Sequence, residues 1–162
     1  FFRPDVELKD LRGNVPTRVN NLKVETYDAV ILASAGVNRL ELDLSEFEVV
    51  ELSPKEFVPA AAQGVLAFQT RENDDETKTV ISKLNDSNVA ECIKVERTIL
   101  NKLEGGCHLP LGAYCKKEDD QFKVWVSMAE DWTETPNRLY REAINSENLA
   151  NEVLADLKKK VG

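Results

Sequence analysis

One short turn of the sequence combines residue types that could do covalent chemistry. Residues 104–113 read EGGCHLPLGA, so Cys107 directly follows two glycines and stands three positions before a proline. Gly105 or Gly106 can adopt the left-handed conformation that ends a helix, and Pro110 fixes the exit of the loop. The spacing predicts a stiff turn between a helix and a strand that presents one sulfur. By spacing alone a buried, inert thiol is the more usual interpretation, since free cysteine is among the most buried residue types.

Three arginines accompany two further loops near the start of the chain. Arg12 and Arg18 lie around the turn at residues 12–14, and Arg39 follows the tight loop at residues 34–36. A guanidinium can hold a carboxylate with two parallel hydrogen bonds, and helix N-termini also favour anions. The arrangement indicates a site for carboxylates; solvated surface arginine is the alternative for each residue taken singly.

The elements expected to position these arginines form half of an open α/β domain. Residues 6–11 and 27–33 are predicted strands, and the second is nearly all apolar, as in a strand covered on both faces. Asn14 is expected to cap a helix over 15–22, and residues 37–42 are expected to form a helical turn. In open α/β sheets ligands bind beside the carboxyl ends of the strands, where both loops fall.

The rest of the chain predicts a small α+β domain with helices packed on one face of an antiparallel sheet. Asn88 is expected to cap the central helix, with Glu91 as its capping-box partner. Cys92 and Cys115 follow the apolar pattern of their elements and are expected to be structural. The predicted helices cover residues 75–84, 88–103 and 146–161, and the predicted strands cover 111–116, 122–128 and 137–142.

Length and composition exclude several classes of protein. The 162 residues suffice for one ordinary domain or two small ones, and a hydrophobic fraction of 42% suits a globular chain. A net charge of -8 argues against nucleic acid as a partner. Three cysteines in no paired spacing and a single histidine argue against a metal site and favour the reducing cytoplasm. No apolar run approaches the roughly 20 residues that span a membrane.

Four motifs in this chain resemble, in order, those of the porphobilinogen deaminase family, also called hydroxymethylbilane synthases. The segment 104–113 is similar to the family's cofactor-attachment loop. Three earlier segments are similar to motifs of its second domain and of its interdomain hinge; they are 11–18 (LRGNVPTR), 27–40 (YDAVILASAGVNRL) and 59–64 (PAAAQG). The family usually has a glycine where Ala62 stands, and alanine resists a positive φ.

The resemblance implies a function in heme and tetrapyrrole biosynthesis. Members of the family are transferases that deaminate four porphobilinogen molecules and polymerise them into hydroxymethylbilane on a covalently bound dipyrromethane. By position, Cys107 would carry this cofactor through a thioether. The residues expected to bind the acetate and propionate groups of the cofactor and the growing pyrrole chain are Arg12, Arg18, Arg39, Ala35 and Gly36.

The resemblance also implies an organisation into parts. Residues 1–57 would belong to the second, α/β domain, which is periplasmic-binding-protein-like. Residues 58–75 would form a hinge, with Gln63 and Gly64, and a crossover strand that pairs with the first domain; residues 76–162 would form the C-terminal α+β domain. The chain starts without Met and matches no part of the first domain, which supplies the family's catalytic acid, so it is expected to be a C-terminal fragment.

Two consequences and two alternatives follow for the chain as it stands. No catalytic residue is identified in it, so alone it is expected to be inactive. Residues 65–71 would leave an unpaired apolar edge, which favours self-association. One alternative is a small-anion binding module with no catalytic role, in which Cys107 is inert, and the other is a purely structural fragment that binds nothing.

Overall fold

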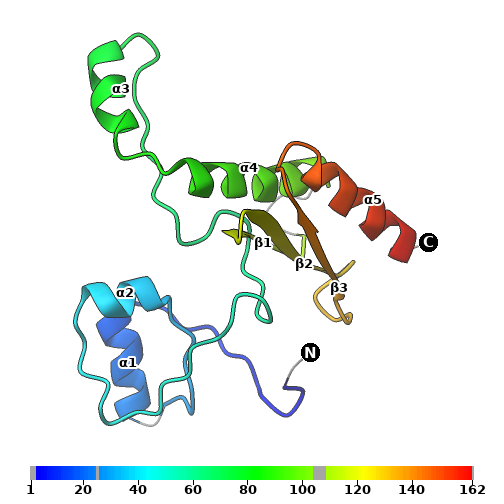
Figure 1. The fold of residues 1–162 in the computed structure, drawn as a ribbon. Helices are drawn as coiled ribbons and strands as arrows, with labels where there is room; N and C mark the ends of the chain where they lie inside the picture. The colour runs from blue at the N-terminus through cyan, green and yellow to red at the C-terminus, as the bar shows by residue number, and fades with distance from the viewer. Residues whose placement is uncertain (1–2, 25, 104–108, 162) are drawn as a thin grey trace. The chain divides into compact units, whose positions relative to one another are not determined.

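The computed structural model describes residues 3–24, 26–103 and 109–161, which form two compact units, residues 1–52 and 53–162 (Figure 1). Each unit is described by itself. No helix within these described ranges is long and apolar enough to cross a membrane. The cytoplasmic location stays a prediction.

The first unit contains the helices α1 (Val15–Lys23) and α2 (Ser34–Arg39). Asn14 begins α1 as predicted: its side chain accepts a hydrogen bond from the backbone N–H of Thr17 at 3.0 Å, and Pro16 occupies the first turn, where no backbone donor is needed. The second helix begins three residues before the predicted helical turn.

The two strands predicted for this unit are not formed. The described residues before residue 53 contain no strand, and Ile31, within the predicted buried strand, is 65% exposed. A strand is stable only when a neighbour completes its hydrogen-bond ladder. The apolar run at 27–33 has no such neighbour within the described part of this unit, so its composition alone does not make it a strand.

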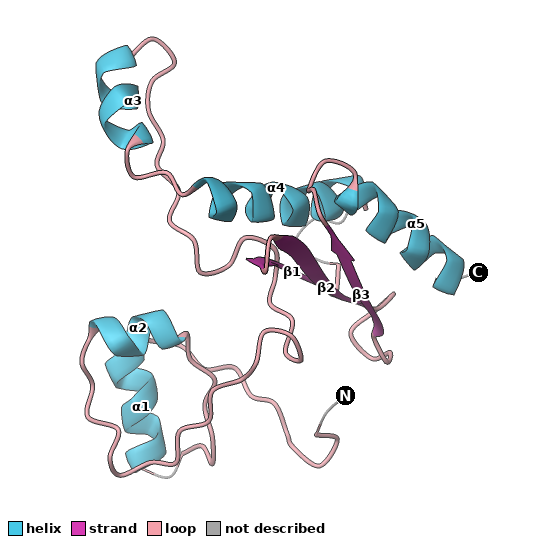
Figure 2. Cartoon of the chain, in the orientation of Figure 1, coloured by secondary structure: helices cyan, strands magenta, loops and turns pink. Residues whose placement is uncertain are grey.

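The second unit is built on a three-stranded antiparallel sheet in the order β1-β2-β3, as predicted (Figure 2). Its strands are β1 (Leu111–Glu118), β2 (Gln121–Met128) and β3 (Asn137–Ala143). A two-residue turn joins β1 to β2, and its residues Asp119 and Asp120 have φ of 52° and 59°. Two consecutive positive φ values match the right-handed twist of a tight hairpin, and aspartate tolerates them better than most residues.

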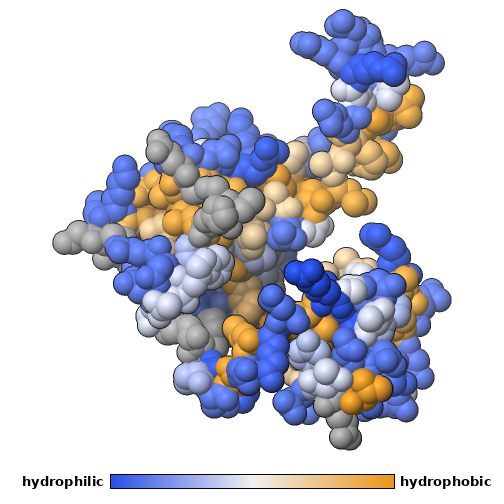
Figure 3. All heavy atoms as spheres, turned by 180° about the vertical axis from the view of Figure 1, so that it is seen from behind, coloured by the Kyte–Doolittle hydropathy of each residue, from blue (hydrophilic) through white to orange (hydrophobic). Residues whose placement is uncertain are grey.

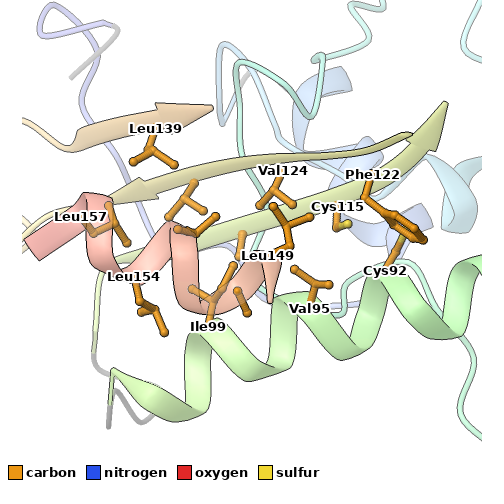
Figure 4. Close-up of a cluster of buried hydrophobic side chains, with 14 of the residues drawn as sticks. Cys92, Val95, Ile99, Cys115, Phe122, Val124, Leu139, Leu149, Leu154 and Leu157 are labelled. Carbon is orange, nitrogen blue, oxygen red and sulfur yellow. The ribbon is translucent and has the colours of Figure 1, made fainter. Parts of the chain in front are cut away.

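The described part of this unit also contains the helices α3 (Asp75–Ser82), α4 (Ser87–Lys102) and α5 (Leu149–Val161). Helix α4 packs on β1 and α5 on β3, and their apolar side chains meet those of the sheet in one core (Figure 4). The largest fully buried side chains of the core are Ile99, Leu149, Leu157, Val124, Val126 and Val153. Cys92 and Cys115 are also buried here, as predicted.

The cap of α4 differs from the prediction. Asp86, not Asn88, begins the helix, and its carboxylate accepts hydrogen bonds from the N–H groups of residues 88 and 89 at 2.9 and 3.1 Å. The amide oxygen of Asn88 instead accepts a hydrogen bond from Lys117 Nζ at 3.1 Å. Asp86 and Asn88 are both residue types that cap helices, and they stand two positions apart; the earlier one is the N-cap. Helix α5 likewise begins at Leu149, later than the predicted residue 146.

Candidate functional site

The loop before α1 owes its shape to a glycine and a cap. Gly13 has φ of +108°, and a Cβ there would stand 3.0 Å from Thr17 Cγ2, so a side chain at this position would be strained in two ways. Arg18 reaches back from the first turn of α1 and donates from Nε to the carbonyl oxygen of Gly13 at 2.8 Å. Its two terminal nitrogens are left to bind other acceptors.

The predicted anion-binding residues all lie in the first unit. Arg12 and Arg39 are exposed, and neither side chain makes a hydrogen bond or ion pair with the residues that the structure describes. Gly36 in α2 lies against Val15, the first residue of α1: a Cβ at Gly36 would be 3.4 Å from Val15 Cγ2. The structure thus brings the beginnings of the two helices together, with Ala35 exposed beside this contact.

A second connection in this unit holds the two loops near each other. The hydroxyl of Tyr27 donates to the carbonyl oxygen of Asp10 at 3.0 Å, so the segment before α2 is tied to the segment before α1. This bond and the Gly36–Val15 contact join the two sequence motifs that carry the arginines. The donor set suits a ligand with several carboxylates, because each guanidinium presents a fork of N–H groups.

The predicted hinge lies in the second unit and packs along β1. The N–H of Ala113 donates to the carbonyl oxygen of Pro59 at 2.9 Å, and a Cβ at Gly112 would approach the carbonyl oxygen of Val58 to 2.5 Å. Only glycine permits so close an approach of two backbones. The turn then passes through Ala62 and Gly64, with φ of 63° and 76°.

Ala62 is therefore a non-glycine residue in the left-handed conformation. Its neighbours in the turn, Gln63 and Gly64, are exposed, and the Gln63 N–H donates to the carbonyl oxygen of Ala60 at 3.3 Å. Such a conformation costs an alanine about 1 kcal/mol and persists only where the surroundings fix it.

Glu96 holds Ala62 in this conformation, a role that was not predicted from the sequence. It is 3% exposed on α4, and its carboxylate accepts hydrogen bonds from the N–H groups of Ala62 and Cys115, both at 2.7 Å. Burial raises the pKa of Glu96, and the two backbone donors partly offset that rise. A sequence signal existed: Glu96 stands four residues after Cys92, in the middle of the apolar stripe of its helix.

A hollow of about 270 Å³ lies between this turn and the body of the second unit. Glu96 lies at its wall with the two buried cysteines. Gln63, Gly64 and Val65 line the side formed by the turn. Among the described residues no group of histidine, cysteine, aspartate and glutamate side chains could hold a metal ion.

Cys107 itself lies outside the described residues, with the rest of 104–108. The structure does define the two stems of its loop. Helix α4 ends at Lys102 with Leu103 as its C-cap, and β1 begins at Leu111. The carbonyl oxygen of Pro110 accepts a hydrogen bond from the N–H of Ala129 at 3.1 Å, so the exit of the loop is held against the sheet.

Comparison with known proteins defines the class of this chain. A family model described as "Porphobilinogen deaminase, dipyromethane cofactor binding domain" matches residues 1–79, and one described as "Porphobilinogen deaminase, C-terminal domain" matches residues 90–158. The two matches place a cofactor-binding part before a C-terminal α+β domain, in the order in which the two structural units occur.

Individual relatives agree with the family models. The porphobilinogen deaminase of Oceanobacillus iheyensis is 43% identical over 120 residues, which are 74% of this chain and 38% of the relative. That of Fusobacterium nucleatum is 34% identical over 98% of this chain and 53% of the relative. That of Maridesulfovibrio salexigens is 36% identical over 95% and 51%. The chain belongs to the porphobilinogen deaminase family of tetrapyrrole-biosynthesis enzymes, and it spans about half the length of the last two relatives.

Proposed function

We propose that this chain is part of an enzyme that deaminates porphobilinogen and joins four molecules of it into hydroxymethylbilane. The observation that supports this most is that matches to one enzyme family, over residues 1–79 and 90–158, extend across both structural units. Porphobilinogen and its products carry several carboxylates, and exposed guanidinium groups on Arg12 and Arg39 suit them. The activity is assigned to a polypeptide as long as the relatives.

Cys107 is the proposed attachment point of the dipyrromethane. When bound, this group supplies the pyrrole carbon from which the product chain grows. The chain's own residues bind and orient: Arg12, Arg18 and Arg39 hold carboxylates of the cofactor and product. Ala35 and Gly36 form the adjoining backbone. Arg18 can do this while its Nε remains bonded to the loop, since its other donors stay available.

The division of labour within the chain is part of the proposal. Residues 1–57 serve as cofactor- and product-binding domain, and residues 76–162 as the domain that carries Cys107. Residues 58–75 are the crossover, with Gln63 and Gly64 as its hinge. The tight backbone contacts of Val58 and Pro59 with β1 support a fixed start for this crossover, and the exposed turn that follows supports a movable continuation.

Alone, this 162-residue chain is proposed to be inactive and to self-associate. Ammonia loss needs a positioned proton donor, and none is identified in it. The segment 65–71 is irregular in the structure, and its side chains Leu66 and Phe68 are 76% and 58% exposed. Apolar surface is visible on the part of the molecule that carries α3 (Figure 3). Exposed apolar side chains favour pairing with a second copy of the chain. Light scattering would detect this association, and a colour assay for pyrrole products would detect any activity.

The experiment that tests the function compares intact masses of the full-length enzyme and its variants. The unaltered enzyme should carry the mass of two linked pyrroles, and Cys107→Ser should lack it while remaining folded. Cys92→Ala is the matched control, because it removes a core thiol and leaves Cys107 in place; its adduct should persist. An unmodified thiol at Cys107 in active enzyme would overturn the assignment and favour the anion-binding alternative.

A second arm of the same experiment separates binding of carboxylates from attachment. Arg39→Leu should retain turnover at most about one hundredth of that of the unaltered enzyme, because a desolvated charge-assisted contact is worth several kcal/mol. Lys94→Leu, at an exposed position of α4, is the charge-matched control and should leave turnover unchanged. Equal turnover in both variants would show that Arg39 is an ordinary surface residue.

A further inference from the structure

Two cysteines that the proposed function does not use lie against each other in the second unit. Cys92 on α4 and Cys115 on β1 are 6% and 5% exposed, both line the same hollow, and their side chains are close enough to interact. Figure 4 shows both at the same end of the core, beside Phe122. Both are free thiols. The two sulfurs are therefore neighbours in space although 22 residues separate them along the chain.

The two thiols differ in acidity. The neighbouring Cys115 thiol lowers the pKa of Cys92, because it stabilises the Cys92 thiolate by more than burial and the Glu96 carboxylate oppose it. The neighbouring Cys92 side chain, together with burial, raises the pKa of Cys115. Of the two thiols, Cys92 is therefore the more acidic. A pair with one nucleophilic and one resolving thiol suits thiol–disulfide exchange.

The pair is also within reach of a small molecule. Both cysteines line the hollow of about 270 Å³ beneath the turn at residues 61–64, together with Gln63 and Gly64 of the turn. A reagent that enters this hollow meets the thiols without crossing the apolar core. Buried thiols elsewhere in a core lack such an approach and are inert.

We propose that Cys92 and Cys115 form a redox site, a dithiol that a small disulfide such as oxidised glutathione converts into an intramolecular disulfide. The Cys92 thiolate attacks one sulfur of the reagent, forms a mixed disulfide and releases one glutathione thiolate. Cys115 then loses its proton and attacks Cys92 Sγ, which releases the second glutathione. The two protein thiols lose two electrons in total, and the reagent is reduced to two thiols.

Oxidation of the pair would stabilise the part of the chain that carries the loop of Cys107. The new bond would join α4 to β1, the two stems of the loop that carries Cys107, and would close a covalent ring from residue 92 to residue 115. Cross-linking a loop of this length removes conformational freedom from the unfolded chain. Oxidation should therefore raise the thermal unfolding midpoint by on the order of 10 °C.

The test is a redox titration of the 162-residue chain without cofactor, in glutathione buffers of graded potential. Samples are quenched in denaturant with N-ethylmaleimide and weighed intact. Reduced chain should take up three maleimides, one for each of its three cysteines, and oxidised chain one. Peptide mapping should find residue 92 linked to residue 115. Three maleimides at every potential, or a link that involves Cys107, would overturn the proposal.

Two variants check the order of the steps. In Cys115→Ser the mixed disulfide has no resolving thiol, so glutathione should remain on Cys92. In Cys92→Ser, Cys115 should stay unmodified at the same pH. Adducts of equal yield on both single cysteines would contradict the assigned roles. Because a core serine can disturb folding, circular dichroism of both variants accompanies the masses, and the mapping of the unaltered chain stands independently of them.

Discussion

The carboxylate of Glu96 joins two segments that are distant in the sequence. It accepts the N–H of Ala62 in the hinge turn and that of Cys115 in β1. Glu96→Ala would leave both buried donors without an acceptor, and each such loss costs about 1–3 kcal/mol. We expect the free energy of unfolding to fall by about 2–4 kcal/mol in urea titrations. Glu91→Ala, at an exposed position of the same helix, should change it by less than about 0.5 kcal/mol.

Glu96 should also make stability depend on pH. Its pKa is raised in the folded chain, chiefly by burial, so near the ordinary carboxyl value the folded state holds a proton that the unfolded chain releases. Its contribution is largest below the ordinary pKa and is lost as the pH rises through the raised one. The titratable groups around it are the thiols of Cys92 and Cys115 and the phenol of Tyr114, whose ordinary pKa values lie well above that of a carboxyl group.

Urea titrations at several pH values would measure this dependence as the difference between the unaltered chain and Glu96→Gln. The difference should shrink with rising pH across that window, because glutamine does not titrate. A difference that grows with pH would mean that the hydrogen bonds outweigh burial and that the pKa is lowered.

Single residues were predictable from sequence where one local rule governs them. Asn14 was identified as a cap and Cys92 as core, and both predictions are confirmed. Glu96 was not identified because its partners, at residues 62 and 115, are brought to it only by the tertiary fold. The role of Cys107 stays a prediction, because this residue lies outside the described ranges.

At the scale of elements, the hinge turn contains a strain that one substitution can relieve. Ala62 has φ of 63°, and glycine adopts this conformation without a Cβ penalty. Ala62→Gly should raise the free energy of unfolding by about 0.5 kcal/mol, since relief of strain exceeds the added freedom of the unfolded chain. Ala61→Gly is the control with the opposite sign: this half-buried residue packs on the core and has no positive φ.

Chemical denaturation of both variants would measure these changes. A loss of stability in Ala62→Gly as large as that in Ala61→Gly would show that the turn carries no strain at residue 62. The sequence had pointed to this position, because the resembling family usually has glycine there.

The elements of the second unit were predictable because each segment shows the hydrophobic period of a helix or a strand and packs against other elements of the same unit. The alternation over residues 122–128 became β2, and the four-residue spacing near the end of the chain became α5. Strands at 6–11 and 27–33 were predicted by composition and are not formed. A strand needs hydrogen-bond partners from neighbouring strands, and the composition of one segment does not tell whether such neighbours exist.

At the scale of the whole molecule, the family and its order of parts were predictable from four motifs, and the comparisons confirm them. The unequal cores of the two units were not. Val19, at 8% exposure, is the buried apolar residue among the described positions of the first unit, whereas the second unit buries a continuous cluster. Composition averaged over 162 residues does not reveal how unevenly burial is distributed.

The difference in buried apolar surface between the two units should appear as a difference in the rates of amide hydrogen exchange. Protection of an amide reflects the free energy of the opening that exposes it, and a unit with little buried apolar surface opens readily. Amides of α1 should therefore exchange at least about 100-fold faster than those of β2, where Val124 and Val126 are almost fully buried. Mass spectrometry of the exchanging chain, with peptides resolved for each helix and strand, would measure both rates.

Two matched substitutions show whether the units open separately. Val124→Ala removes two methyl groups from the core of the second unit and should cost about 2 kcal/mol, which speeds exchange of β1, β2 and α4 about 30-fold and leaves α1 unchanged. Val19→Ala should speed exchange of α1 alone. If Val124→Ala accelerates α1 as much as β2, the chain unfolds as one cooperative body, and the small core of the first unit is then stabilised by contacts beyond its own residues.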